Sequence, residues 1–200
     1  MMKILNIISS PIKDQSSAST KLGNAIISKL QEKYTDSMLT VHNIAQNPLP
    51  HLEEIQMTSF FTADEKRTLQ QKEALKLSDK IVAEVMNADL IVINVPMYNF
   101  GISSTLKTWL DHLIRKDLTF QHMPGGIQGM VNGKKVYLAI STGGIYSEGP
   151  RKHLDFTENY LTSVLGFIGI SDVTTFRIEA QSKPDLKEEY TAKAMKNILI

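Results

Sequence analysis

Hydroxyl side chains gather directly after the first apolar run of the chain, in the segment Ser9-Ser10-Pro11-Ile12-Lys13-Asp14-Gln15-Ser16-Ser17-Ala18-Ser19-Thr20. An amphipathic repeat follows and predicts a helix, and helix N-termini combine free N–H groups with a partial positive charge that favours phosphate. The segment contains neither G-x-G-x-x-G nor G-x-x-x-x-G-K-[ST], which argues against a dinucleotide cradle and excludes a Walker loop. A terminal monophosphate, as on FMN, suits these hydroxyls. Simple N-capping by Ser17 or Ser19 would also account for them.

Two later segments also follow apolar runs and could contact a flat heterocycle. In Pro96-Met97-Tyr98-Asn99-Phe100, a methionine and two aromatic rings form an apolar platform, and Asn99 offers hydrogen bonds. In Ser141-Thr142-Gly143-Gly144, the glycines permit positive φ and close approach of backbone to a ligand. Taken singly, the first is more often core packing and the second a plain turn. Together with the hydroxyl-rich segment, they indicate a flavin site.

Predicted strands and predicted helices alternate along the chain, and they must position these segments. Short apolar runs predict strands over 4–8, 38–44, 90–95, 136–140 and 173–178, and most of them lack the alternation of a half-exposed strand. Helical repeats predict helices over 22–30, 77–86, 106–114, 161–168 and 190–198, and residues 46–70 are expected to form a surface excursion. We therefore predict a single α/β domain over residues 1–200. It would be a three-layer α/β/α sandwich around a five-stranded parallel sheet in the order 2-1-3-4-5.

In such a sheet, ligands bind beyond the carboxyl ends of the strands, at the point where the strand order reverses. For the order 2-1-3-4-5, that point lies between the first and third strands. The three segments described above follow the first, third and fourth strands. The fold therefore predicts that they meet at one edge of the sheet.

These residues carry a resemblance to a known family. The chain resembles the FMN-dependent NADH-azoreductases, a branch of the flavodoxin-like quinone reductases, over essentially its whole length. The matching motifs, in the family's order and at about its spacing, are Pro96-Met97-Tyr98-Asn99-Phe100, Asn47-Pro48-Leu49-Pro50, Gly133-Lys134-Lys135, Ser141-x-Gly143-Gly144 and Leu165-Gly166-Phe167-Ile168-Gly169-Ile170.

The resemblance assigns roles by position. The phosphate and ribityl end would be held by Ser10, Ser17, Ala18 and Ser19, and the isoalloxazine by Pro96, Met97, Tyr98, Asn99 and Phe100. The pyrimidine side would be closed by Ser141, Thr142, Gly143 and Gly144. Two departures stand out: the turn often carries Arg where this chain has Thr142, and a longer first loop leaves Ser16 and Ser17 as alternatives.

The resemblance also implies the activity. Bound FMN would take a hydride from NADH, with NADPH possible, and deliver an electron pair to a quinone or azo acceptor in a ping-pong sequence. A homodimer is implied, with Trp109 as a candidate interface residue (core packing is the alternative) and residues 119–126 as a flexible flap. An electron-carrying flavodoxin and a non-catalytic FMN-binding regulator are the rival interpretations. Such carriers are typically acidic, whereas this chain has a pI near 7.9.

Composition excludes several other classes. The chain has no cysteine, so it has no disulfide or thiolate nucleophile, which fits a cytoplasmic protein. Its five histidines are scattered, and we predict neither a metal site nor a catalytic side chain beyond the flavin. A net charge of +1 without a basic cluster argues against nucleic-acid binding, and no apolar stretch is long enough for a membrane span. The strand ends lack the acidic cluster of a response-regulator receiver.

Overall fold

A computed structural model describes residues 1–13 and 16–200. Asp14 and Gln15, which belong to the hydroxyl-rich segment, lie outside the described residues. The elements in chain order are β1 (Met2–Ile8), α1 (Ala18–Lys33), β2 (Ser37–Asn43), α2 (Glu54–Phe61), α3 (Leu69–Asn87), β3 (Leu90–Pro96), α4 (Ser104–Leu113), β4 (Phe120–Met123), β5 (Gly126–Gly129), β6 (Lys135–Ser141), α5 (Thr157–Phe167), β7 (Asp172–Ile178) and α6 (Pro184–Lys196). Two short 3-10 turns lie at Asp64–Lys66 and Lys152–Leu154.

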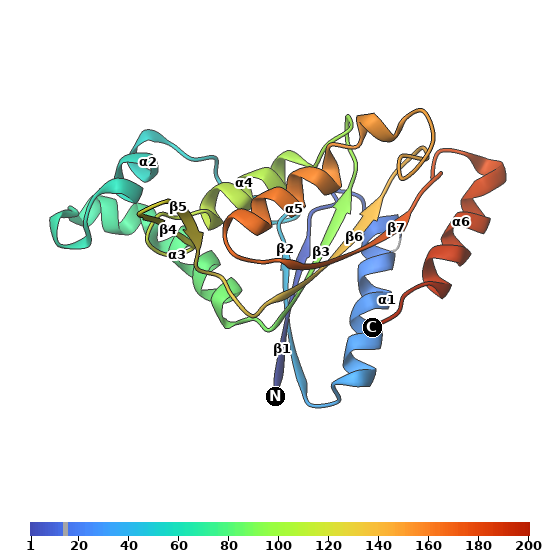
Figure 1. Cartoon of the computed structure of the whole chain (residues 1–200), viewed down its shortest axis with the longest axis horizontal. Helices are drawn as coiled ribbons and strands as arrows, with labels where there is room; N and C mark the ends of the chain where they lie inside the picture. The colour runs from blue at the N-terminus through green and yellow to red at the C-terminus, as the bar shows by residue number, and fades with distance from the viewer. Residues whose placement is uncertain (14–15) are drawn as a thin grey trace.

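The central sheet has five parallel strands in the order β2-β1-β3-β6-β7 (Figure 1). Counting only the sheet strands, this is the predicted order 2-1-3-4-5, and each predicted strand overlaps an observed one. The order reverses between β1 and β3, whose registers pair Ile8 with Asn94. The carboxyl ends of β1, β3 and β6 therefore lie side by side, as the sequence predicts.

Helices cover both faces of the sheet, which gives the predicted three layers. On one face, α1 and α6 pack against Ile4, Val92 and Ala139. On the other face, α3, α4 and α5 pack against Leu5, Ile93 and a longer run of buried aliphatic residues. Successive residues of a strand face opposite layers, so a central strand buried on both sides reads as a continuous apolar run.

Trp109 belongs to the core. It lies on α4 with 1% of its surface exposed in the single chain, and it packs in the cluster between the sheet and α3, α4 and α5. The suggestion that it contributes to a dimer interface is therefore wrong, and the core alternative holds.

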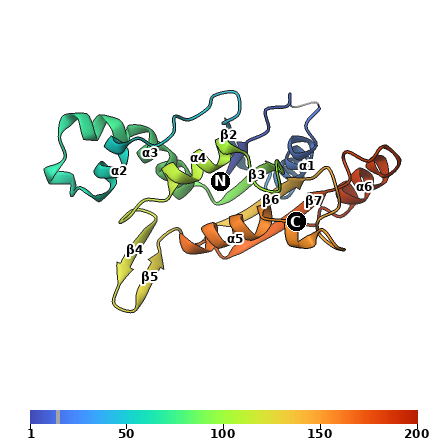
Figure 2. The same ribbon diagram turned by 90° about the horizontal axis from the view of Figure 1, so that it is seen from above.

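The excursion after β2 is more ordered than expected. It contains α2, and α3 begins at Leu69, several residues before the predicted start, with a capping box between Thr68 and Gln71. The Pro50 carbonyl lies 2.9 Å from His112 Nε2, and this contact ties the excursion to α4. Residues 120–129 form the β4–β5 hairpin, which projects from the body of the protein near α5 (Figure 2). The predicted flap, residues 119–126, lies largely within this hairpin, and its flexibility stays a prediction.

Candidate functional site

Side-chain and backbone hydrogen bonds join the three predicted segments at the carboxyl edge of the sheet. Ser9 Oγ donates to the Asn94 carbonyl at 2.7 Å, linking the end of β1 to β3. The Met97 N–H donates to the Ser141 carbonyl at 2.8 Å, linking the segment after β3 to the segment after β6. The structure therefore brings together residues that the chain separates by more than 120 positions.

The first segment forms a compact hydroxyl cluster at the start of α1. Ser17 is the N-cap, and its Oγ accepts from Thr20 N at 3.3 Å and Thr20 Oγ1 at 3.0 Å, while Ser19 Oγ lies 3.2 Å away. All three side chains are buried, as is Ser10. A hydroxyl that accepts hydrogen bonds still carries a proton to donate, and the first N–H groups of a helix have no partner within it. Because the first turn of α1 contains no acidic residue, the cluster suits an anion such as a monophosphate.

The second segment is a tight, strained turn. Tyr98 and Gly101 exchange backbone hydrogen bonds of 2.9 and 3.0 Å, so Asn99 and Phe100 occupy the two central positions of a two-residue hairpin. Both have positive φ, +48° for Asn99 and +70° for Phe100. Asparagine tolerates this conformation, but an aromatic residue in it is strained, and strain of this kind is concentrated at functional sites. The turn holds both side chains exposed at the edge of the sheet.

The third segment is held by the chain that follows β7. Backbone N–H groups of residues 180–182 donate to the carbonyls of Thr142, Gly143 and Gly144, each at 3.0 Å. The Thr142 hydroxyl donates to the Gly144 carbonyl at 2.8 Å, so it closes the turn instead of facing outward. Thr142, the position where the resemblance leads us to expect Arg, therefore serves the turn itself.

The expectation of positive φ at Gly143 and Gly144 is wrong. The glycines with positive φ lie elsewhere in the described chain, at Gly125, Gly126, Gly133, Gly149 and Gly169. A Cβ on Gly143 would lie 2.7 Å from Ser182 Oγ, and one on Gly144 would lie 3.0 Å from the Tyr146 ring, so both glycines leave room for neighbouring side chains. Close approach to a ligand stays a prediction.

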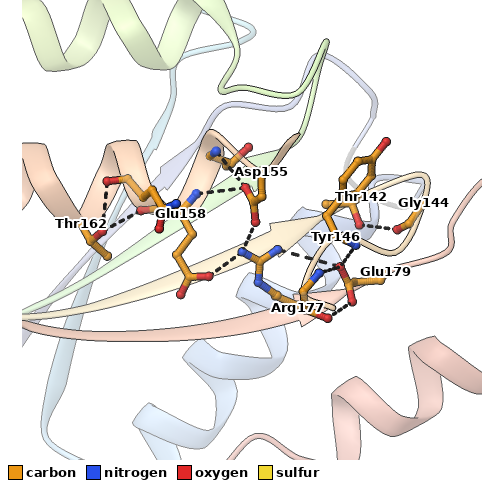
Figure 3. A network of polar contacts seen from close by, with 11 residues as sticks. Thr142, Gly144, Tyr146, Asp155, Glu158, Thr162, Arg177 and Glu179 are labelled. Atoms are coloured by element: carbon orange, nitrogen blue, oxygen red, sulfur yellow. Dashed lines mark hydrogen bonds and ion pairs between the residues drawn. The ribbon is translucent and has the colours of Figure 1, made fainter. Parts of the chain in front are cut away.

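A charged network lies beside this segment and was not predicted (Figure 3). Arg177 on β7 forms ion pairs with Asp155, Glu158 and Glu179. Burial alone would lower the pKa of the Arg177 guanidinium, but the hydrogen bond to Glu158 and the charges of Asp155 and Glu158 raise it above its ordinary value. Glu179 in turn accepts hydrogen bonds from the Tyr146 and Ser147 amides. In the sequence, the only available signal was a pair of charges in an otherwise apolar strand end, Arg177 and Glu179.

A hollow of about 340 Å³ lies at the start of α1, between α1 and α6, and Ser16, Ala18, Lys21, Gln181 and Thr191 contribute to its lining. A larger one of about 590 Å³ lies at the opposite, amino-terminal edge of the sheet, away from the three segments. Across the described ranges 1–13 and 16–200, no group of three His, Cys, Asp or Glu side chains is placed to hold a metal ion. In the same part of the chain, no helix combines the length and apolarity needed to cross a bilayer.

Known proteins share this architecture and sequence. The family described as having a flavodoxin-like fold matches residues 2–199. An FMN-dependent NADH:quinone oxidoreductase of Herminiimonas arsenicoxydans is 44% identical over 179 residues, covering 90% of this chain and 87% of that protein. One of Beijerinckia indica subsp. indica is 39% identical over 198 residues, covering 99% and 98%.

A solved structure extends the comparison. The crystal structure of an azoreductase from Bacillus anthracis superposes with a TM-score of 0.91 at 27% identity, covering 98% of this chain and 96% of that one. The shared sequence, fold and strand order lead to one conclusion: this chain belongs to the flavodoxin-like fold family, among the FMN-dependent NADH:quinone oxidoreductases and azoreductases.

Proposed function

We propose that this protein is an FMN-dependent oxidoreductase that carries electron pairs from NADH to quinones and azo compounds. The observation that carries the proposal is the meeting of three segments at the switch point of the sheet, where a buried hydroxyl cluster lies on one side and an exposed, strained aromatic turn on the other. Relatives that match nearly the whole chain bear the name of this activity.

Each segment has a distinct part in binding. The Ser17 and Ser19 hydroxyls and the first amides of α1 hold the phosphate, with Ser10 beside them. The Tyr98–Gly101 turn presents Asn99 to the polar edge of the ring and its aromatic neighbour to the face. The Ser141–Gly144 segment backs the pyrimidine side. FMN supplies the hydride and electron-pair chemistry when bound, so the chain needs to bind, orient and shield rather than to provide an acid or base.

The two substrates are expected to use one face of the site in turn. In the proposed placement the three segments would hold the flavin from the sheet side and leave a single ring face open, on which both the nicotinamide and the acceptor would have to stack. Initial rates of NADH oxidation at several quinone concentrations should give parallel lines in double-reciprocal plots, with inhibition by excess quinone that is competitive with NADH. Intersecting lines would require both substrates to be bound together and would contradict the single-face arrangement.

We also infer that two copies of the chain associate. Exposed apolar side chains lie on α2 and around the β4–β5 hairpin, and these two elements are in the same half of the molecule, on its upper and lower sides in Figure 2. They are Met57, Phe61, Leu118, Met123 and Ile127. We call this set the apolar end. Exposed apolar side chains of this size are typical of protein interaction surfaces, and a two-fold pairing would cover them on both copies.

Light scattering tests this pairing. The wild-type protein should have about twice the chain mass of 22.4 kDa. Replacing both Phe61→Glu and Ile127→Glu places two charges in the apolar end, and we expect this variant to run as a monomer because burying unpaired charge is costly. The matched control is Leu199→Glu, which changes an exposed apolar residue outside the apolar end and should leave the dimer intact. A fully active wild-type monomer would defeat the inference.

A further inference from the structure

Arg177 is one cation among three carboxylates, and most of the group is buried. The side chains of Arg177, Asp155 and Glu179 are 14%, 9% and 6% exposed, and Glu158 is 35% exposed. Buried ion pairs contribute little to net stability, because the desolvation of both partners offsets their attraction. The excess of negative charge makes this cluster still less favourable as a purely stabilising device. The hydrogen bonds that these carboxylates make outside the cluster indicate a further role.

Glu179 reaches out of the cluster to the chain that follows the third segment. One carboxylate oxygen accepts from the Tyr146 N–H at 2.7 Å and the Ser147 N–H at 2.9 Å, and the other accepts from the Ser147 hydroxyl. A single carboxylate therefore satisfies three donors that lie more than 30 positions away in sequence. Figure 3 shows Glu179 between Arg177 on one side and the Tyr146 turn on the other.

The Tyr146 side chain connects the residues held by Glu179 to the strained turn between Tyr98 and Gly101. Its ring meets the ring of Phe100 edge to face, with centroids 6.2 Å apart. Phe100 has φ of +70°, a conformation that a non-glycine residue keeps only when its surroundings enforce it. The Tyr146 ring is one such enforcing contact.

Asp155 provides a second connection from Arg177 to the same turn. Its carboxylate pairs with Arg177 and also accepts from the Thr157 N–H at 2.9 Å, at the start of α5. The residue between them, Phe156, donates its N–H to the Phe100 carbonyl at 3.1 Å. Arg177 is thus hydrogen-bonded to Asp155 at one end of the 146–156 loop and lies 4.0 Å from Glu179 at the other, and each end of the loop contacts Phe100.

We propose that Glu179 is a positioning residue of the flavin site: its carboxylate, 4.0 Å from Arg177 Nη1, fixes Tyr146 against Phe100 and keeps the Asn99–Phe100 turn in its strained, ring-binding form. This rests on the proposed placement of the flavin ring at that turn. The carboxylate suits the task because two oxygens can accept three hydrogen bonds at once, and the guanidinium compensates its buried charge.

The test compares Glu179→Ala with Glu158→Gln in the full-length protein. Both remove a carboxylate partner of Arg177, but in this structure only Glu179 contacts the Tyr146 turn. Without FMN, amide hydrogen exchange at Tyr146 and Ser147 should accelerate in Glu179→Ala and remain as in wild type in Glu158→Gln. The FMN dissociation constant should rise on the order of 10-fold in Glu179→Ala, which corresponds to about 1.4 kcal/mol, and stay unchanged in Glu158→Gln.

Glu179→Gln provides the conservative variant. Its amide oxygen can still accept from the two N–H groups, so we expect FMN affinity and the visible circular dichroism of the bound flavin to return toward wild type. If Glu179→Ala and Glu158→Gln lower the melting temperature alike and both keep wild-type FMN affinity, Glu179 only stabilises the fold and the inference is overturned. Wild-type protein that binds FMN without oxidising NADH would instead defeat the proposed function, and the exchange and affinity readouts would still decide the role of Glu179.

Discussion

Replacing Gly23 with alanine should lower the free energy of unfolding by about 3–5 kcal/mol, a large fraction of the stability of a typical domain. Gly23 lies inside α1, on the face that packs against β3. A Cβ at this position would lie 1.5 Å from Asn94 Oδ1 and 2.6 Å from its Cγ. The two residues cannot coexist in their present positions once residue 23 has a side chain.

Asn94 has little freedom to move away. It is fully buried on β3, and its Nδ2 donates to Asn6 Oδ1 at 2.6 Å and to the Ile7 carbonyl at 3.0 Å. Displacing it would break both hydrogen bonds and leave buried acceptors without donors, at about 1–3 kcal/mol for each unsatisfied group. Alanine is favoured over glycine by about 1 kcal/mol in a helix, which is too little to offset this loss.

Gly166→Ala provides a matched control for the same substitution in another helix. Gly166 lies near the end of α5, and a Cβ there would have no atom of residues 1–13 or 16–200 within 4 Å apart from its own surroundings in the helix. That variant should be neutral or more stable by about 0.5–1 kcal/mol, because it only reduces the freedom of the unfolded chain. Urea unfolding of both variants gives the comparison, and equal effects of the two substitutions would show that the contact with Asn94 is unimportant.

The strands could be predicted from sequence because a buried parallel strand has a local signature. Runs such as 90–95 are apolar at nearly every position, and the observed β3 spans Leu90–Pro96 with all seven residues buried. Asn6 and Asn94 are polar residues within such runs, where a buried amide needs a hydrogen-bond partner, and they are hydrogen-bonded to each other. Gly23, which lies in α1 against Asn94, is also informative in the sequence, since a glycine inside a helical repeat can have a packing reason.

Helix boundaries were predicted less well, because periodicity reports burial and not helicity. The first two turns of α3 are largely exposed, with Leu69 88% exposed, so no apolar repeat marks them. The reverse error occurs at the end of the chain: Ile198 is buried and fits the repeat of α6, yet the helix ends at Lys196. A buried residue just beyond the end of a helix can continue the apolar repeat of that helix, and the repeat then predicts a helix that is too long.

The three segments of the candidate site could be predicted from the sequence, but the contacts between residues far apart in the chain could not. The first, second and third segments each follow a strand directly, so strand order alone brings them together. The Arg177 network depends on pairs such as Arg177–Asp155 and Glu179–Tyr146, which only the tertiary structure juxtaposes. Single charges in a sequence are most often solvated, and nothing in their spacing distinguishes these from surface charges.

FMN should bind the flavin-free protein at least about 100-fold more tightly than riboflavin, which lacks only the phosphate. The reason lies at the start of α1, where the Ser17 and Ser19 hydroxyls and the first helix amides converge. Hydrogen bonds to a charged group contribute about 1.5–3 kcal/mol each, and the helix N-terminus adds a favourable field. Two such bonds, after the cost of desolvating the phosphate, account for a preference of this size. Titration of each ligand, followed by quenching of its fluorescence, measures the ratio.

Ser19→Ala then tests whether the phosphate lies where we place it. Ser19 is fully buried in the hydroxyl cluster but is not the N-cap, so its loss should spare the helix, whereas Ser17→Ala would also cost about 1 kcal/mol of capping. Losing one donor to a charged acceptor should weaken FMN binding on the order of 10-fold and leave riboflavin binding unchanged. Riboflavin is thus the internal control, because a general loosening of the site would weaken both ligands together. An equal loss of affinity for both ligands, or no loss for either, would contradict the placement of the phosphate at the start of α1.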